Sequence, residues 1–114
     1  MSRIEIRPRG GVEVERYVKA VMDLEEELTL GGVDVATLRT RAEPVMSTIL
    51  ISVLGGVLSH YIIKLADGLI KKKREEPDNV KIVIEFNHQS FELPEEYGRL
   101  RADLASPPRT EENE

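Results

Sequence analysis

Residues 45–63 read VMSTILISVLGGVLSHYII and contain no Asp, Glu, Lys or Arg. A bilayer core requires roughly 20 apolar residues in helical form, so this stretch lies at the boundary between a membrane span and a buried helix. Upstream, Pro44 suits the first turn of a helix. Downstream, the run KKKR at 71–74 complements the negative end of a helix dipole. We therefore expect one long apolar helix from about Pro44 to about Arg74.

Small side chains form a separate stripe along this expected helix. They are Thr48, Ser52, Gly55, Gly56 and Ser59. In one interpretation the glycines let the helix approach a sheet closely, and the serine hydroxyls bond back within the helix. In the other, the stripe is an interaction surface that builds a homo-oligomer or docks a protein partner, because a helix that is apolar on both sides requires burial on both sides.

The amino-terminal part has the pattern of a strand, a helix and a second strand. Ile4 and Ile6 alternate with charged residues, which is typical of a half-buried strand. Residues 12–28 place apolar side chains on one helical face, and the glycine pair at 31–32 follows as a stop signal. Residues 33–37 are rich in β-branched side chains, as strands are. A right-handed crossover would let these two strands pair in parallel.

The carboxy-terminal part predicts a hairpin and a short helix. Residues 80–86 alternate as a strand does, 87–90 form a plausible turn, and 91–93 return as a second strand. Pro94 and the acidic residues after it are typical of a helix start. The expected fold class is thus α+β, with a small mixed sheet in the order β-α-β-α-β-β-α and the long apolar helix packed on it. We expect one domain over residues 1–105 and a disordered acidic tail over 106–114.

Composition narrows the function classes. The chain has 114 residues, 32% of them charged, and a formal net charge of −5, which argues against nucleic acid as a partner. Only five aromatic residues are present, so platforms for base stacking are also disfavoured. The absence of cysteine excludes disulfides and thiolate chemistry. No apolar signal segment opens the chain, and we expect a cytoplasmic protein.

Catalytic candidates are few. His60 lies in the expected long helix and His88 in the expected turn. A lone histidine in a helix is usually a structural, hydrogen-bonded residue, and a turn histidine is usually solvated. No histidine and carboxylate spacing matches a zinc site, and no glycine pattern matches a phosphate loop. We expect no enzyme activity, no metal and no cofactor, although the roles of His60 and His88 stay open.

The membrane alternative is a single-span accessory protein in which a helix over residues 45–66 crosses the bilayer. The small-xxx-small spacing and the following basic residues are expected of such a span. A span would, however, divide the strands between two compartments in pieces too short to build stable cores. For this reason we favour a helix buried in protein.

The basic patch has two interpretations of its own. It comprises Lys71, Lys72, Lys73 and Arg74. Its charges either cap the helix dipole and stay solvated, or they contact an anionic lipid or an acidic partner at about 1 kcal/mol per residue near an anionic membrane. The acidic pair at 75–76 follows directly and would weaken that attraction.

The order of these segments resembles the effector-associated constant component family of prokaryotic conflict systems. The similar parts are the short opening strand at 4–7, the acidic amphipathic helix, the VLGGVL segment at 53–58, the basic cluster at 71–74 and the hairpin at 80–93. The resemblance covers the chain to about Ala105 and is one of architecture. It implies a non-catalytic accessory or adaptor subunit that links a sensor to an effector in prokaryotic defence, and it implies no functional residues.

Overall fold

The computed structural model describes residues 2–10, 13–38, 47–75 and 79–105. Its elements are β1 (Ser2–Arg9), α1 (Glu13–Met22), α2 (Glu25–Leu30), β2 (Val33–Thr37), β3 (Thr48–Leu54), α3 (Ser59–Glu75), β4 (Lys81–Phe86), β5 (Gln89–Leu93) and α4 (Tyr97–Ala105). The described residues thus form an α+β fold, as the sequence predicts.

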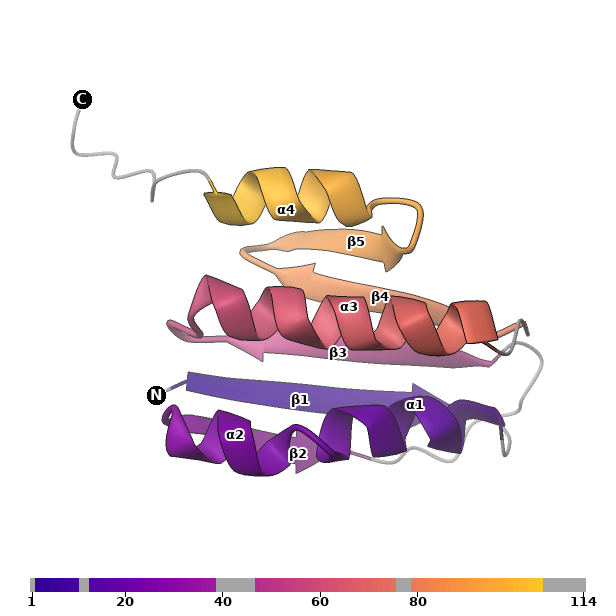
Figure 1. Cartoon of the computed structure of the whole chain (residues 1–114), viewed down its shortest axis with the longest axis horizontal. Helices are drawn as coiled ribbons and strands as arrows, with labels where there is room; N and C mark the ends of the chain where they lie inside the picture. The colour runs from indigo at the N-terminus through magenta and orange to yellow at the C-terminus, as the bar shows by residue number, and fades with distance from the viewer. Residues whose placement is uncertain (1, 11–12, 39–46, 76–78, 106–114) are drawn as a thin grey trace.

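The five strands make one mixed sheet in the spatial order β2-β1-β3-β4-β5 (Figure 1). β1 pairs with β2 in parallel, which confirms the expected parallel pairing of these strands. β3 runs antiparallel to β1 and parallel to β4, and β5 returns antiparallel to β4. The third strand along the chain therefore lies at the centre of the sheet.

The helices lie to one side of this sheet. In Figure 1, α1 and α2 lie in front of β1 and β2, α3 lies in front of β3 and β4, and α4 runs beside β5. Alternate residues of each strand point to the same side of the sheet. On the face that the helices cover, these residues are mostly apolar. The fully buried side chains of this face include Ile4, Ile6, Ile49, Ile51, Ile82 and Ile84. The helices contribute further side chains to this core, among them Tyr17 and Val21 of α1 and Ile62, Leu65 and Leu69 of α3.

The prediction of one long helix from Pro44 to Arg74 is wrong. Its first half is β3, and Ile49, Ile51 and Val53 alternate inward with the two-residue period of a strand. These β-branched side chains favour a pleated surface. Gly55 then adopts φ 77°, a left-handed conformation that a helix cannot continue through. Only the second half, α3, is helical, and it ends with the predicted basic turn.

The membrane alternative loses its helix for the same reason. Residues 48–54 of the proposed 45–66 span belong to the central strand, while 45 and 46, like Pro44, lie outside the described residues. Within the described ranges, no helix combines the length and the apolar character that crossing a bilayer requires.

Three smaller predictions need adjustment. The expected helix over 12–28 is two helices, α1 and α2, although its predicted inner face is buried. The hairpin turn is shorter than 87–90, since Gln89 and Ser90 already pair in β5. The helix expected after Pro94 begins at Tyr97. The acidic tail over 106–114 lies outside the described residues.

Candidate functional site

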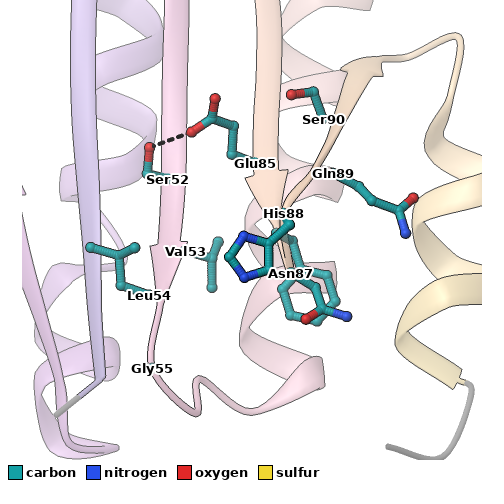
Figure 2. A pocket seen from close by; sticks show the side chains of 10 residues that line it. Ser52, Val53, Leu54, Gly55, Glu85, Asn87, His88, Gln89 and Ser90 are labelled. Carbon is teal, nitrogen blue, oxygen red and sulfur yellow. Dashed lines mark hydrogen bonds between the residues drawn. The ribbon is translucent and has the colours of Figure 1, made fainter. Parts of the chain in front are cut away.

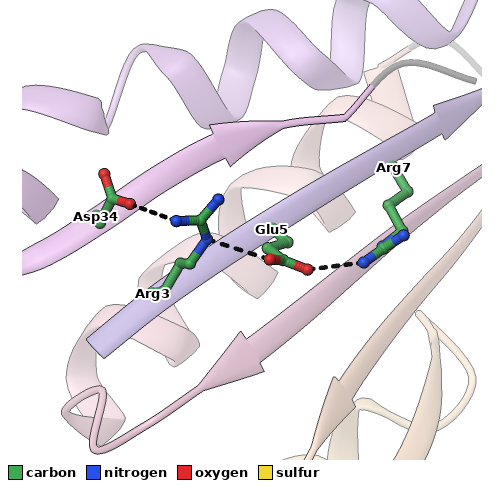
Figure 3. A network of polar contacts seen from close by, with 4 residues as sticks. All are labelled: Arg3, Glu5, Arg7 and Asp34. Carbon is green, nitrogen blue, oxygen red and sulfur yellow. Dashed lines mark hydrogen bonds and ion pairs between the residues drawn. The ribbon is translucent and has the colours of Figure 1, made fainter. Parts of the chain in front are cut away.

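The most distinctive surface is the face of the sheet that α1, α2 and α3 do not cover, here called the open face. It is built from the alternate residues of each strand. On β1 these include Arg3, Glu5 and Arg7, which interleave with the buried Ile4 and Ile6. Figure 3 shows their side chains on the near side of the strands, with the helices behind.

An ion-pair network organises one end of the open face. Arg3 donates from Nη1 to Asp34 Oδ2 at 3.0 Å and from Nε to Glu5 Oε2 at 3.1 Å. Arg7 donates from Nη2 to the other Glu5 oxygen, Oε1, at 2.8 Å. The Glu5 side chain is only 17% exposed, so two guanidinium groups hold its carboxylate in place. Such sharing gives the two guanidinium groups defined positions around one carboxylate.

Apolar side chains lie beside this network. The strand register aligns Arg7 with Leu50 of β3, Val83 of β4 and Glu92 of β5. Leu50 and Val83 are half-buried, and charged residues flank them on both sides. An apolar centre with a polar rim is the usual composition of a protein-protein interface.

A hollow of about 570 Å³ opens where β3 and the β4–β5 hairpin end (Figure 2). It is lined by Ser52, Val53, Leu54, Gly55, Glu85, Phe86, Asn87, His88, Gln89 and Ser90. Inside it, Ser52 donates a hydrogen bond from Oγ to Glu85 Oε1 at 3.1 Å. The hollow can therefore accept hydrogen bonds through Glu85 and offer the imidazole of His88 to a polar group.

The two histidines lie on different elements. His88 is exposed in the hairpin turn, and no hydrogen bond joins it to Ser52 or Glu85 within the described part of the chain. His60 is exposed in the first turn of α3, where its ring lies 4.1 Å from that of Tyr61, centroid to centroid. Among the described residues, no three His, Cys, Asp or Glu side chains are grouped as metal ligands would be.

The predicted stripe of small residues does not lie on one helical face. Thr48 and Ser52 lie on the open face of β3, Gly55 and Gly56 follow that strand, and Ser59 begins α3. Ser52 and Gly55 both line the hollow. Ser59 instead donates from Oγ to the carbonyl oxygen of Leu104 at 3.5 Å, which ties α3 to α4.

The predicted basic patch lies at the carboxyl end of α3. Lys71 and Arg74 are exposed, and Lys72 and Lys73 are half-buried. Lys73 donates from Nζ to the carbonyl oxygen of Val80 at 2.5 Å, so one of the four cations fastens the helix to the segment before β4. The other proposed roles of this patch stay predictions.

The sequence interpretation did not identify the open face as a site. The alternation of Arg3, Glu5 and Arg7 was a sufficient signal that these residues share one side of a strand. Leu50 and Ser52 gave no such signal, because the helical interpretation of residues 44–74 concealed the strand that places Ser52 beside Glu85.

A scan of protein-family models finds none that matches this chain, and a search of curated proteins finds no significant match.

Proposed function

We propose that this chain is a non-catalytic interaction module, a cytoplasmic accessory or adaptor subunit that binds a protein partner through its open face. One observation carries the proposal: among the described residues, helices cover the sheet on one side and leave the other side open. On the other side, the Arg3–Glu5–Arg7 network holds charges in fixed positions beside Leu50 and Val83. Ordered charges around apolar side chains favour a specific protein partner.

The charges of this face disfavour nucleic acid as the partner. Asp34, Glu5 and Glu85 are interspersed with Arg3 and Arg7. Binding to a phosphate backbone instead requires a patch of one positive sign. The resemblance to the effector-associated constant component family motivates the further proposal that the partner is a sensor or effector protein of a prokaryotic conflict system.

Co-purification with the products of the flanking genes tests this role, using two variants with the same charge change. Arg7→Glu places a second carboxylate beside Glu5 and disrupts the network. Lys19→Glu changes an exposed cation of α1, on the helical side. We expect Arg7→Glu to weaken partner binding by about tenfold or more, whereas Lys19→Glu should leave the affinity within about twofold.

A partner that binds both variants as well as the wild type would contradict a role for the open face. If no flanking gene product binds the wild-type chain, the proposed place in a conflict system is wrong.

A further inference from the structure

The two edge strands of the sheet, β5 and β2, differ in whether their outward backbone groups are hydrogen-bonded. At the β5 margin, the backbone N–H of Glu92 donates to Glu96 Oε1 at 2.8 Å. The carbonyl oxygen of Glu92 accepts from the N–H of Glu96 at 2.7 Å. Both outward backbone groups of Glu92, the next-to-last residue of this strand, are therefore used by its own chain. A further strand cannot pair there without breaking those bonds.

At the β2 margin, the described residues show no comparable hydrogen bonds to the outward backbone groups. The N–H of Leu38 donates to the carbonyl oxygen of Ile6 at 2.7 Å, so residues of even number direct their backbone groups toward β1. The backbone groups of Val33, Val35 and Thr37 consequently point away from the sheet. No hydrogen bond engages these outward groups within the described ranges.

We propose that a second copy of this chain adds to the β2 margin, with the two β2 strands antiparallel and the twofold axis at Val35. In this register Val35 exchanges both backbone hydrogen bonds with Val35 of the other copy. Val33 of each copy does the same with Thr37 of the other. Every outward N–H and C=O of both strands is then paired. The result is a continuous sheet across a twofold interface, in which both copies use the same surface.

The side chains select this register over its neighbour. On the open face, Asp34 of each copy lies opposite Ala36 of the other, so no like charges are directly opposed. A shift to the register that pairs Val33 with Val35 would place Asp34 opposite Asp34. That register opposes two carboxylates and leaves Thr37 without a partner.

The helical side of the same margin carries an unusual apolar residue. α2 packs on β2, and Leu30 at its end is 83% exposed. Leu30 lines a hollow of about 360 Å³ together with Met22, Glu25, Glu26 and Thr29. Joining two β2 strands places the two α2 helices on the same side of the continuous sheet, where each can cover the other's Leu30.

Sedimentation of the full chain over a concentration series tests the proposal. We expect the wild type to reach twice its chain mass of 12.9 kDa. Val35→Pro removes an outward N–H but no bond to β1, and proline is tolerated on edge strands. This variant should keep the wild-type circular dichroism spectrum, and its dimer dissociation constant should rise by about tenfold or more. A wild type that stays monomeric throughout, or a folded Val35→Pro dimer of unchanged affinity, overturns the proposal.

A second test does not depend on how Val35→Pro folds. Ala36→Asp should weaken the dimer by about tenfold, since it opposes two pairs of carboxylates. Mixing Ala36→Asp with Asp34→Lys should yield mainly heterodimers, because the introduced aspartate then faces the introduced lysine. An effect on the single chain cannot produce this preference, and statistical mixing overturns the proposed register. Arg7 lies outside the β2 margin, so Arg7→Glu should leave the dimer intact. The measurement of partner binding and the measurement of the dimer can therefore fail independently of each other.

If a strand of another protein normally occupies the margin, the purified chain alone stays monomeric, which counts against the proposal. If the dimer forms through the open face, Arg7→Glu dissociates it while Val35→Pro does not, which also overturns the proposal.

Discussion

Tyr97 links α4 to α3, because its hydroxyl donates a hydrogen bond to Oδ1 of Asp67. Burial, followed by the hydrogen bond and charge of Asp67, raises the pKa of Tyr97 above its ordinary value. A raised folded-state pKa contributes stability that is fully present below the ordinary tyrosine pKa and is lost as the pH rises through the higher value. We predict that, in a pH titration followed by tyrosinate absorbance, the Tyr97 hydroxyl ionises at a higher pH than a free tyrosine does.

Two variants check that this ionisation belongs to Tyr97 and that Asp67 shifts its pKa. Tyr97→Phe should remove the late step from the titration, and Asp67→Asn should move it to lower pH, because the amide carries no negative charge. If Asp67→Asn leaves the step unchanged, the carboxylate does not contribute to the shift.

The hairpin turn holds two residues in the left-handed region, Asn87 at φ 57° and His88 at φ 66°. Asparagine tolerates this conformation, whereas most side chains are strained in it by about 1 kcal/mol or more. We predict that His88→Gly stabilises the fold by up to about 1 kcal/mol, because Asn-Gly is the favoured pair for such a two-residue turn. Denaturant midpoints would measure the gain.

Asn87→Gly is the matched control, and its gain should be smaller since asparagine is less strained there. A loss of stability in His88→Gly would mean that the imidazole makes stabilising contacts in the turn that outweigh the strain.

Strand β3 gives the sharpest contrast between neighbouring side chains. Ile51 is 0% exposed in the core, and Leu50, one residue earlier, lies half-buried on the open face. We predict that Ile51→Ala costs about 2–5 kcal/mol of unfolding free energy, whereas Leu50→Ala costs about 1 kcal/mol. Urea denaturation of the two variants measures the difference.

A helix over these residues would give another result. Residues 50, 51 and 54 would share one side of a helix, so their alanine variants would all be costly. Leu54 is 43% exposed at the end of β3, and Leu54→Ala should be nearly neutral. Similar costs for all three substitutions would contradict the strand.

The assembled molecule leaves three large apolar side chains exposed among its described residues, and two of them allow a matched comparison. Leu30 ends α2 at the β2 margin, and Leu58, 56% exposed, precedes α3. We predict that Leu30→Glu weakens self-association by about tenfold or more, while Leu58→Glu leaves it unchanged. Sedimentation at several concentrations distinguishes the two, with thermal unfolding as the check on folding.

Equal effects of both substitutions would mean that self-association is nonspecific and driven by exposed apolar surface. An effect of Leu58→Glu alone would place the contact at the loop before α3 rather than at the β2 margin.

Part of the open face follows from local pattern. The alternation of Arg3, Glu5 and Arg7 with two isoleucines is enough to place the charged side chains together on one side of a strand. The pairing of Ser52 with Glu85 is different, because these residues are 33 positions apart and meet only when β3 and β4 align. The hollow at the hairpin end depends on the same alignment.

Periodicity and turn chemistry act over a few residues, and they are enough to predict the α+β class, the inner face of α1, the glycine stop before β2 and the hairpin. They are not enough to predict the conformation of residues 48–54. The apolar residues of this segment suit a buried helix as well as a buried strand, and periodicity alone does not separate the two. Pairing with β1 on one side and β4 on the other settles the choice, because those ladders satisfy the backbone groups of a segment whose alternate side chains are buried. Both ladders join residues that are far apart in the chain, so the strand forms only when the sheet does.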